Sequence, residues 1–220
     1  MGSFSAENMR FFLYIFPVLL LSVAIHEFAH CWTTDRLGDD TPRMQGRLTL
    51  NPLAHLDPLG TVMMVVSSLS GFGFGWGKSS PMNPYNFANP ARDRMLSALA
   101  GPVSNILQML AWASIGVLAK PFIPADSPAI CILYLSTYGV VINAILAGFN
   151  LLPVYPLDGH HVLSYLAPPS LRPVIDNPAW GVVFLILVFT GAFRVVVQPV
   201  LIGAVVVTHF LVGWTPTLPL

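Results

Sequence analysis

The sequence His26-Glu27-Phe28-Ala29-His30 places two imidazoles and a carboxylate inside a long run of apolar residues. At about 100° per residue on a helix, His26 and His30 point to one face, one turn apart. Two neutral imidazoles at that spacing can bind one Zn²⁺, and Glu27 can stand beside the metal and take a proton from its water. Ionisable residues inside membrane segments are costly and mark functional sites. The pattern predicts a metal centre with His26 and His30 as ligands and Glu27 as the catalytic base.

The composition predicts an all-α polytopic membrane protein. The chain has 220 residues, of which 55% are hydrophobic and 9% charged, and its mean hydropathy is +0.69. Apolar runs at about 11–32, 95–119, 130–152, 180–197 and 200–214 predict about five to six transmembrane helices. The first run carries the histidines and lacks a cleavage site, so we expect it to be retained rather than removed as a signal peptide.

Charge and cysteine content exclude several other classes of protein. Ten basic residues balance ten acidic residues, so the chain offers no basic surface for nucleic acid. The two cysteines, Cys31 and Cys131, form no CxxC motif, which argues against a disulfide framework and against a thiolate zinc site.

A glycine-rich segment follows the short apolar run 61–69. In residues 71–77 glycine alternates with aromatic residues, which does not suit a spanning helix. The period of two predicts a short membrane-associated β or re-entrant segment, in which Gly73, Phe74 and Gly75 could pair with an extended substrate peptide. A close-packed glycine turn with interfacial aromatics is an equally weighted alternative.

The third metal ligand is expected to come from far along the chain. Pro153 and Pro156 unwind the end of the run 130–152 before Asp158, and Gly159 follows it, which suits a backbone that presents one side chain at a fixed point. We therefore favour Asp158. Four other histidines remain alternatives for this position: His160, His161, His55 and His209.

The placement of charge predicts the orientation. Six of the ten basic residues flank the first two long spans on one side: Arg36, Arg43, Arg47, Lys78, Arg92 and Arg94. The positive-inside rule makes that side cytoplasmic. If 61–77 dips into the membrane and returns, Asp158 reaches the same side as the histidines, whereas a full crossing would separate them.

Three motifs in this order resemble the site-2 proteases, the intramembrane zinc metalloproteases of peptidase family M50. They are His26-Glu27-Phe28-Ala29-His30, Gly101-Pro102-Val103-Ser104-Asn105, and Asn150-Leu151-Leu152-Pro153-Val154-Tyr155-Pro156-Leu157-Asp158-Gly159. The resemblance covers about residues 11–165 and implies one integral membrane metalloprotease domain over 1–220, with further helices at about 180–214. The sequence departs from the family's usual pattern in two respects, so we expect a short form with no PDZ domain and with no span ahead of the one that carries the first motif.

The resemblance also implies roles for individual residues. His26, His30 and Asp158 would bind one Zn²⁺ per chain and Glu27 would be the general base. Asn105, a polar group inside a span, would lie near the substrate carbonyl and its oxyanion, and the segment around Gly73 would meet substrate.

The expected function is intramembrane zinc endopeptidase activity, which hydrolyses peptide bonds within or near transmembrane segments of membrane-anchored substrates. Its partners would be the lipid bilayer and single-span membrane proteins or signal peptides. We expect an integral protein of the cell (inner) membrane with its active site near the cytoplasmic face. The alternative is a zinc-binding membrane protein without peptidase activity, either a metal carrier or an inactive homologue. Glu27 separates the two, because metal transport does not require a carboxylate between the histidines.

Overall fold

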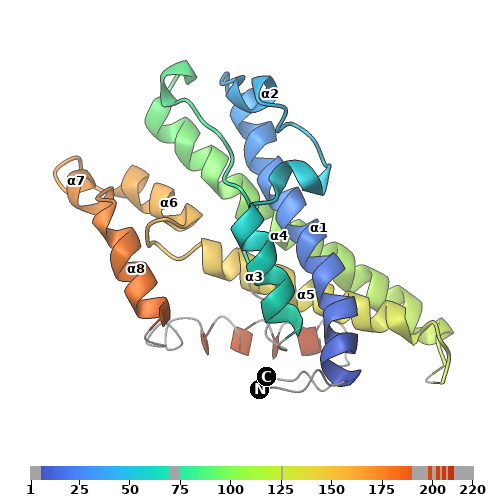
Figure 1. Cartoon of the computed structure of the whole chain (residues 1–220). Helices are drawn as coiled ribbons and strands as arrows, with labels where there is room; N and C mark the ends of the chain where they lie inside the picture. The colour runs from blue at the N-terminus through green and yellow to red at the C-terminus, as the bar shows by residue number, and fades with distance from the viewer. Residues whose placement is uncertain are drawn as a thin grey trace.

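The computed structural model describes residues 6–69, 75–124 and 126–189, together with 198–199, 202–203, 205–206 and 208–210. This part of the chain is mostly helical and contains no strand, as the all-α prediction requires (Figure 1). The helices are α1 (Ala6–Arg36), α2 (Thr41–Met44), α3 (Pro58–Leu69), α4 (Pro90–Ala119), α5 (Ile130–Asn150), α6 (Asp158–Leu166), α7 (Arg172–Ile175) and α8 (Ala179–Phe189). Short 3-10 turns lie at Pro52–His55, Pro84–Asn86 and Lys120–Phe122.

Three of the described helices are long and apolar enough to cross a membrane. They are Met9–Arg36 in α1, Pro90–Phe122 in α4 and its following turn, and Ile130–Asn150 in α5. The apolar helix α3 is shorter than a span. The expected runs 180–197 and 200–214 lie largely outside the described residues, so a total of five to six spans stays a prediction. The chain is therefore a membrane protein with three candidate spans in its described part.

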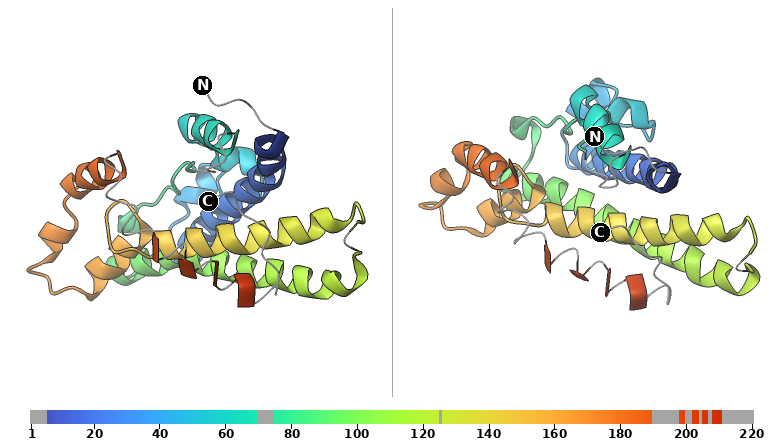
Figure 2. Two further views of the ribbon diagram at one scale, coloured as in Figure 1. Left: turned by 90° about the horizontal axis from the view of Figure 1, so that it is seen from below. Right: turned by 60° about the horizontal axis from the view of Figure 1, so that its bottom comes forward.

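The three long helices form the body of the protein. Helices α4 and α5 lie side by side, and α1 packs against both of them (Figure 2). Helix α3 packs on α1, and α6 packs on α4. The buried cluster between α1, α3 and α5 includes Val18, Met64 and Ile142. This packing fixes the C-terminal half of α1 against α4, which is where the predicted metal ligands lie.

Helix α4 begins at Pro90, ahead of the apolar run 95–119 from which its span was predicted. Pro90 occupies the first turn, where its missing N–H costs nothing and its fixed φ favours the helix. The Asn89 side chain caps the helix by accepting a hydrogen bond from the backbone N–H of Arg92 at 3.3 Å. Arg92 and Arg94 are thus in the first turns of the helix.

The described end of the glycine-rich segment runs close to α1 and α3. A Cβ atom on Gly75 would lie 2.6 Å from Cβ of Met64, and one on Gly77 would lie 2.8 Å from Val23 Cγ1. Gly77 forms an isolated antiparallel bridge with Leu56. Gly73 and Phe74 lie outside the described residues, so the expected substrate segment stays a prediction. Its described end is extended backbone that only glycine allows so near the helices.

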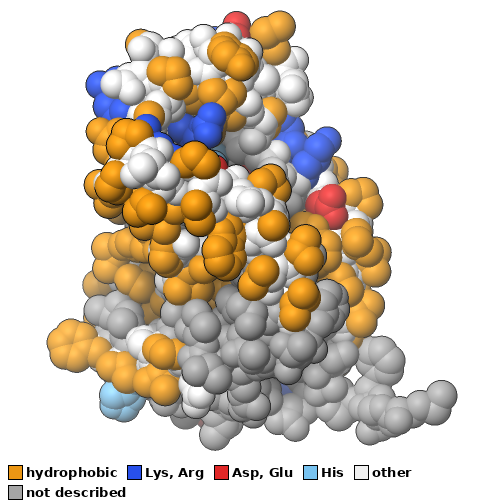
Figure 3. Space-filling view, turned by 90° about the vertical axis from the view of Figure 1, so that its left-hand side faces the viewer, with side chains coloured by type: hydrophobic (Ala, Val, Ile, Leu, Met, Phe, Trp, Pro, Cys, Tyr) orange, Lys and Arg blue, Asp and Glu red, His pale blue; other side chains and the backbone are white. Residues whose placement is uncertain are grey.

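Hydrophobic side chains cover much of the surface, as a lipid-facing protein requires. In Figure 3 they spread over the middle of the face in view, while Lys and Arg side chains lie in its upper half. Residues on α3 and α4 that would be buried in a soluble protein are exposed here, including Val66 at 54%, Leu107 at 62% and Leu118 at 71%. Burial against lipid rather than protein accounts for this pattern.

Candidate metal centre

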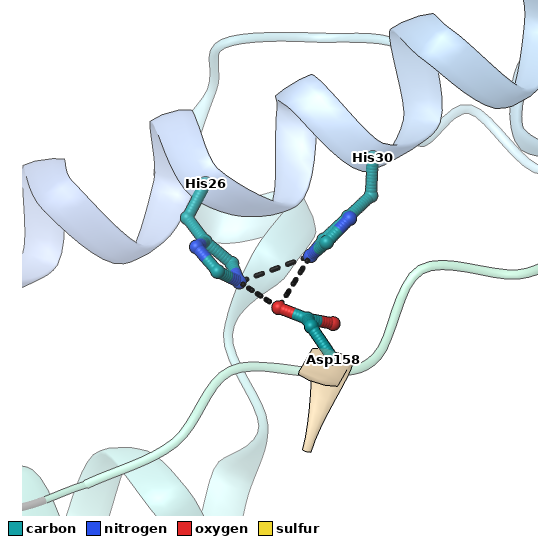
Figure 4. A group of neighbouring side chains, drawn as sticks. All are labelled: His26, His30 and Asp158. Atoms are coloured by element: carbon teal, nitrogen blue, oxygen red, sulfur yellow. Dashed lines mark hydrogen bonds and ion pairs between the residues drawn. The ribbon is translucent and has the colours of Figure 1, made fainter. Parts of the chain in front are cut away.

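The structure brings together the side chains of His26, His30 and Asp158 (Figure 4). Both histidines project from one face of α1, and Asp158 is the first residue of α6. Asp158 Oδ2 lies 3.3 Å from Nε2 of His26 and 3.4 Å from Nε2 of His30. The two Nε2 atoms are 3.0 Å apart. Both imidazoles are buried, so the cluster is inside the protein.

The far side of each imidazole is held by an acceptor. His30 donates from Nδ1 to the backbone carbonyl of Ser97 at 2.7 Å, and His26 donates from Nδ1 to Oδ1 of Asn105 at 2.6 Å. In a neutral imidazole only one ring nitrogen carries a proton. Both Nε2 atoms therefore have a lone pair that faces Asp158.

Three electron-pair donors that face one another can hold a metal cation between them. Asp158 Oδ2 is buried and has no hydrogen-bond partner among the described residues. Ligand atoms about 2.0–2.1 Å from a tetrahedral Zn²⁺ lie about 3.3–3.4 Å apart, which matches the two Asp158 distances. Two imidazoles and one carboxylate leave a fourth position open, as in catalytic zinc sites. The residues present thus fit zinc.

Gly101 of α4 provides the space beside the imidazoles. A Cβ atom at this position would collide with the ring of His30 and would lie 2.5 Å from Cε1 of His26. The next residue, Pro102, has no N–H with which to continue the helical hydrogen bonds. The Gly101-Pro102 pair therefore lets α4 approach α1 at the metal centre.

The four alternative histidines lie outside this cluster. His55 is in the turn after Asn51 and its Nε2 contacts the carbonyl of Thr49 at 2.7 Å. His160 Nε2 contacts Asp176 Oδ1 at 3.0 Å, and His209 is exposed. Burial, together with nearby His160 and Arg94, lowers the pKa of His161 to about 4, so this residue is neutral at pH 7.

Glu27 and Asn105 have contrasting surroundings. Glu27 Oε2 is buried and has no hydrogen-bond partner among the described residues. Asn105 is fully buried, with Oδ1 on His26 and Nδ2 donating to Asn143 Oδ1 at 2.8 Å. Both polar ends of Asn105 are thus engaged inside the protein, and its expected role at the substrate carbonyl stays a prediction.

Three residues at this site were not singled out for it from the sequence: Ser97, Gly101 and Asn143. Ser97 contacts His30 through its backbone carbonyl, which every residue has, so the residue type could not predict this contact. Gly101 belongs to a recognised motif, but its contact with the imidazoles requires the packing of α4 on α1. Asn143 did carry a signal, because a second asparagine in a membrane span must also find a polar partner.

Comparison with known proteins identifies the family. The chain is 36% identical over 194 residues to the Bacillus subtilis protein named "Putative zinc metalloprotease YwhC", covering 86% of this chain and 85% of the relative. It is 32% identical over 184 residues to "Putative zinc metalloprotease Rip2" of Mycobacterium tuberculosis, covering 81% of this chain and 67% of the relative. The chain belongs to this family of zinc metalloproteases. No family model and no solved structure matches it.

Membership of the zinc metalloprotease family implies Zn²⁺ as the metal, in agreement with the donor set. Two nitrogens and one carboxylate oxygen are ligands that zinc accepts. The three side chains of this candidate metal centre come from α1 and α6, and α4 supplies the carbonyl and the amide that contact the two imidazoles.

Proposed function

We propose that this zinc metalloprotease is an intramembrane endopeptidase of the site-2 type. The observation that carries the proposal is the buried carboxylate oxygen of Glu27, which has no hydrogen-bond partner among the described residues. Glu27 follows the ligand His26 on α1, a helix long enough to span a membrane. An unpaired buried carboxylate costs free energy and is retained where its proton affinity is used.

The chemistry is peptide hydrolysis by an activated water. Zinc, when bound, lowers the pKa of a water molecule and polarises a carbonyl group. Glu27 accepts the proton of the attacking water and passes it to the departing amine, which is general acid–base catalysis by one carboxylate. His26, His30 and Asp158 hold the metal and leave one position open. A metal carrier needs the three ligands but not Glu27.

The substrate must present an unwound peptide to this site. A transmembrane helix has its carbonyls hydrogen-bonded internally, so local unwinding precedes attack, and Gly or Pro near the cut lowers the cost. The extended backbone at Gly77 runs beside Glu27, since a Cβ there would lie 3.4 Å from Glu27 Cγ. We propose that this backbone and the preceding Gly73, Phe74 and Gly75 receive the unwound substrate by strand addition.

The site is proposed to open toward the cytoplasm of a cell-membrane protein. Basic residues lie at the end of α1, in α2 and at the start of α4: Arg36, Arg43, Arg92 and Arg94. By the positive-inside rule this end faces the cytoplasm. The proposed substrates are single-span membrane proteins and leftover signal peptides.

Glu27→Gln is the experiment that tests the function. The change keeps size and polarity but removes the ability to take a proton, and it touches neither imidazole. Zinc content should match the wild type, while cleavage of single-span reporters with Gly or Pro in their apolar segment should fall on the order of 10²- to 10⁴-fold. Cleavage at the wild-type rate by Glu27→Gln would contradict the proposed mechanism.

A further inference from the structure

We infer that Asn143 controls, through Asn105, which ring nitrogen of His26 carries the proton, and so keeps Nε2 free for the metal. A series of hydrogen bonds runs from a backbone carbonyl of α5 to the imidazole on α1. The first bond determines which group donates and which accepts in each of the others. The inference rests on the metal centre of the proposed function and is independent of the peptidase step.

The series begins at the carbonyl of Gly139. Asn143 Nδ2 donates to this carbonyl at 2.8 Å and to Oγ of Ser22 at 3.0 Å. Asn143 Oδ1 then accepts from Asn105 Nδ2 at 2.8 Å. Asn105 Oδ1 accepts from His26 Nδ1 at 2.6 Å. Four groups on three helices are thus joined in series.

The direction of this series follows from its first member. A backbone carbonyl only accepts hydrogen bonds, so the nitrogen of the Asn143 amide must face Gly139. If the amide were reversed, two oxygens without a proton would face each other at 2.8 Å. With Asn143 fixed, its oxygen faces Asn105, so Asn105 must turn its nitrogen to Asn143 and its oxygen to His26. His26 then carries its proton on Nδ1 and keeps the Nε2 lone pair for the metal.

Burial prevents water from replacing any part of this series. Ser22, Asn105 and Asn143 are each 0% exposed. A buried polar group without a hydrogen bond costs free energy. Water cannot reach these side chains to supply such a bond. The asparagine pair therefore does more than join α4 to α5, because a single hydrogen bond in either direction would have sufficed for that.

His30 reaches the same state by a shorter route. Its Nδ1 donates directly to the carbonyl of Ser97, which also only accepts. Among the described residues, His26 Nδ1 contacts the side-chain oxygen of Asn105 instead of a backbone carbonyl. The orientation of that oxygen is set by Asn143, whose own amide is oriented by the carbonyl of Gly139. In both imidazoles the proton is therefore on Nδ1, and Nε2 keeps a lone pair that can bind a metal.

Asn143→Leu tests the inference, with zinc affinity as the measurement. Without the Asn143 oxygen, the Asn105 amide can turn and offer its nitrogen to His26, which moves the imidazole proton to Nε2. In full-length protein in detergent, competition with a chelator should show Zn²⁺ affinity lower on the order of 10- to 100-fold, as for other groups that orient metal ligands. Ser22→Ala is the matched control: it removes one bond to Asn143 but leaves Gly139 in place, and zinc affinity should stay close to wild type.

A second substitution separates the direction of the bonds from simple packing. In the Asn143→Leu background, Asn105→Asp places a carboxylate on His26 that can only accept, so zinc affinity should recover toward wild type. A loss caused by packing alone would not recover. Wild-type affinity in Asn143→Leu, or no recovery in the double variant, would overturn the inference.

Should Asn143→Leu fail to fold, Asn105→Asp and Asn105→Leu test the step on which the inference depends, that an acceptor on His26 Nδ1 supports zinc binding. The aspartate keeps an acceptor on His26 and the leucine removes it. Tighter zinc binding by the aspartate supports the inference, and equal affinities would overturn it. Because zinc affinity is measured rather than cleavage, failure here is distinct from failure of the proposed peptidase activity.

Discussion

Gly101 on α4 lies against the imidazole of His30, so that an added Cβ atom would collide with Nε2, the nitrogen that faces Asp158. Replacing Gly by Ala in the interior of a helix ordinarily stabilises the folded protein by about 0.5–1 kcal/mol. At this position the added methyl group would collide with a metal ligand. Because α4 contacts α1 so closely here, Ala should destabilise the protein instead of stabilising it.

Gly101→Ala should lose zinc binding, because His30 or the whole of α4 must shift to accept the methyl group. The loss of well-packed contacts should also destabilise the protein by about 1–3 kcal/mol. Zinc content by elemental analysis and the thermal unfolding temperature in detergent measure both effects. Gly181→Ala is a control, since its nearest atoms belong to the Tyr155 side chain at 3.1 Å. Full zinc occupancy in Gly101→Ala would contradict the packing described here.

Asp158→Ala and His160→Ala should differ in their effect on the metal. Asp158 Oδ2 faces both ligand imidazoles, whereas His160 Nε2 contacts Asp176 at 3.0 Å. Removing the carboxylate should weaken zinc binding strongly and leave the inserted fold intact. Removing His160 should retain zinc. If elemental analysis finds the reverse order, the third ligand has been assigned to the wrong residue.

Asp39 should make the loop after α1 sensitive to acid. Burial opposes its charge, but hydrogen bonds from Thr41, Asn83 and Asn86 outweigh burial and hold the pKa of the carboxyl below its ordinary value. Because the pKa is lower in the folded chain, the charge stabilises the fold fully above the unfolded pKa of about 4 and loses this contribution as the pH falls below it.

Asp39→Asn should therefore destabilise the protein at pH 7 by about 1–3 kcal/mol, since it weakens charge-assisted hydrogen bonds. The difference in unfolding temperature between wild type and variant should stay constant above about pH 5 and shrink as the pH is lowered through about 4 and below. A difference that is independent of pH would show that the charge on Asp39 is not what stabilises the loop.

Sidedness can be measured with single cysteines after Cys31 and Cys131 are replaced. Arg43 is exposed in the basic loop, and Asp126 is exposed in the connection between α4 and α5 at the other end of these helices. In whole cells an impermeant reagent should label Asp126→Cys and spare Arg43→Cys. Labelling of Arg43→Cys alone would place the active site near the outer face.

The local parts of the site could be predicted from the sequence. The spacing of His26 and His30 requires only helix geometry, and Pro156 and Gly159 indicated that Asp158 could leave a helix and approach them. A polar group inside a membrane span, such as that of Asn105, needs a polar partner. Each of these inferences depends on residues close in sequence or on the cost of a polar group in lipid.

The contacts between helices could not be predicted in the same way. The Ser97 carbonyl and the Gly101 contact depend on how α4 packs against α1, which hydropathy does not encode. The direction of the Asn105 amide depends on the backbone carbonyl of Gly139. The residue type does not indicate which groups a backbone carbonyl contacts. Hydropathy gave the apolar run 95–119 but not the start of α4 at Pro90, because the first turn of this helix contains the charged residues Arg92 and Asp93.

The most direct test of the account is hydrolysis in ¹⁸O-labelled water. Purified zinc-loaded protein is incubated with a single-span reporter carrying Gly-Pro in its apolar segment, and the products are weighed by mass spectrometry. We predict a cut inside the apolar segment, ¹⁸O in the new carboxyl terminus, and no such product from Glu27→Gln at equal zinc content. The same labelled product in equal amount from Glu27→Gln, or a cut confined to the soluble flanks of the reporter, would contradict the account.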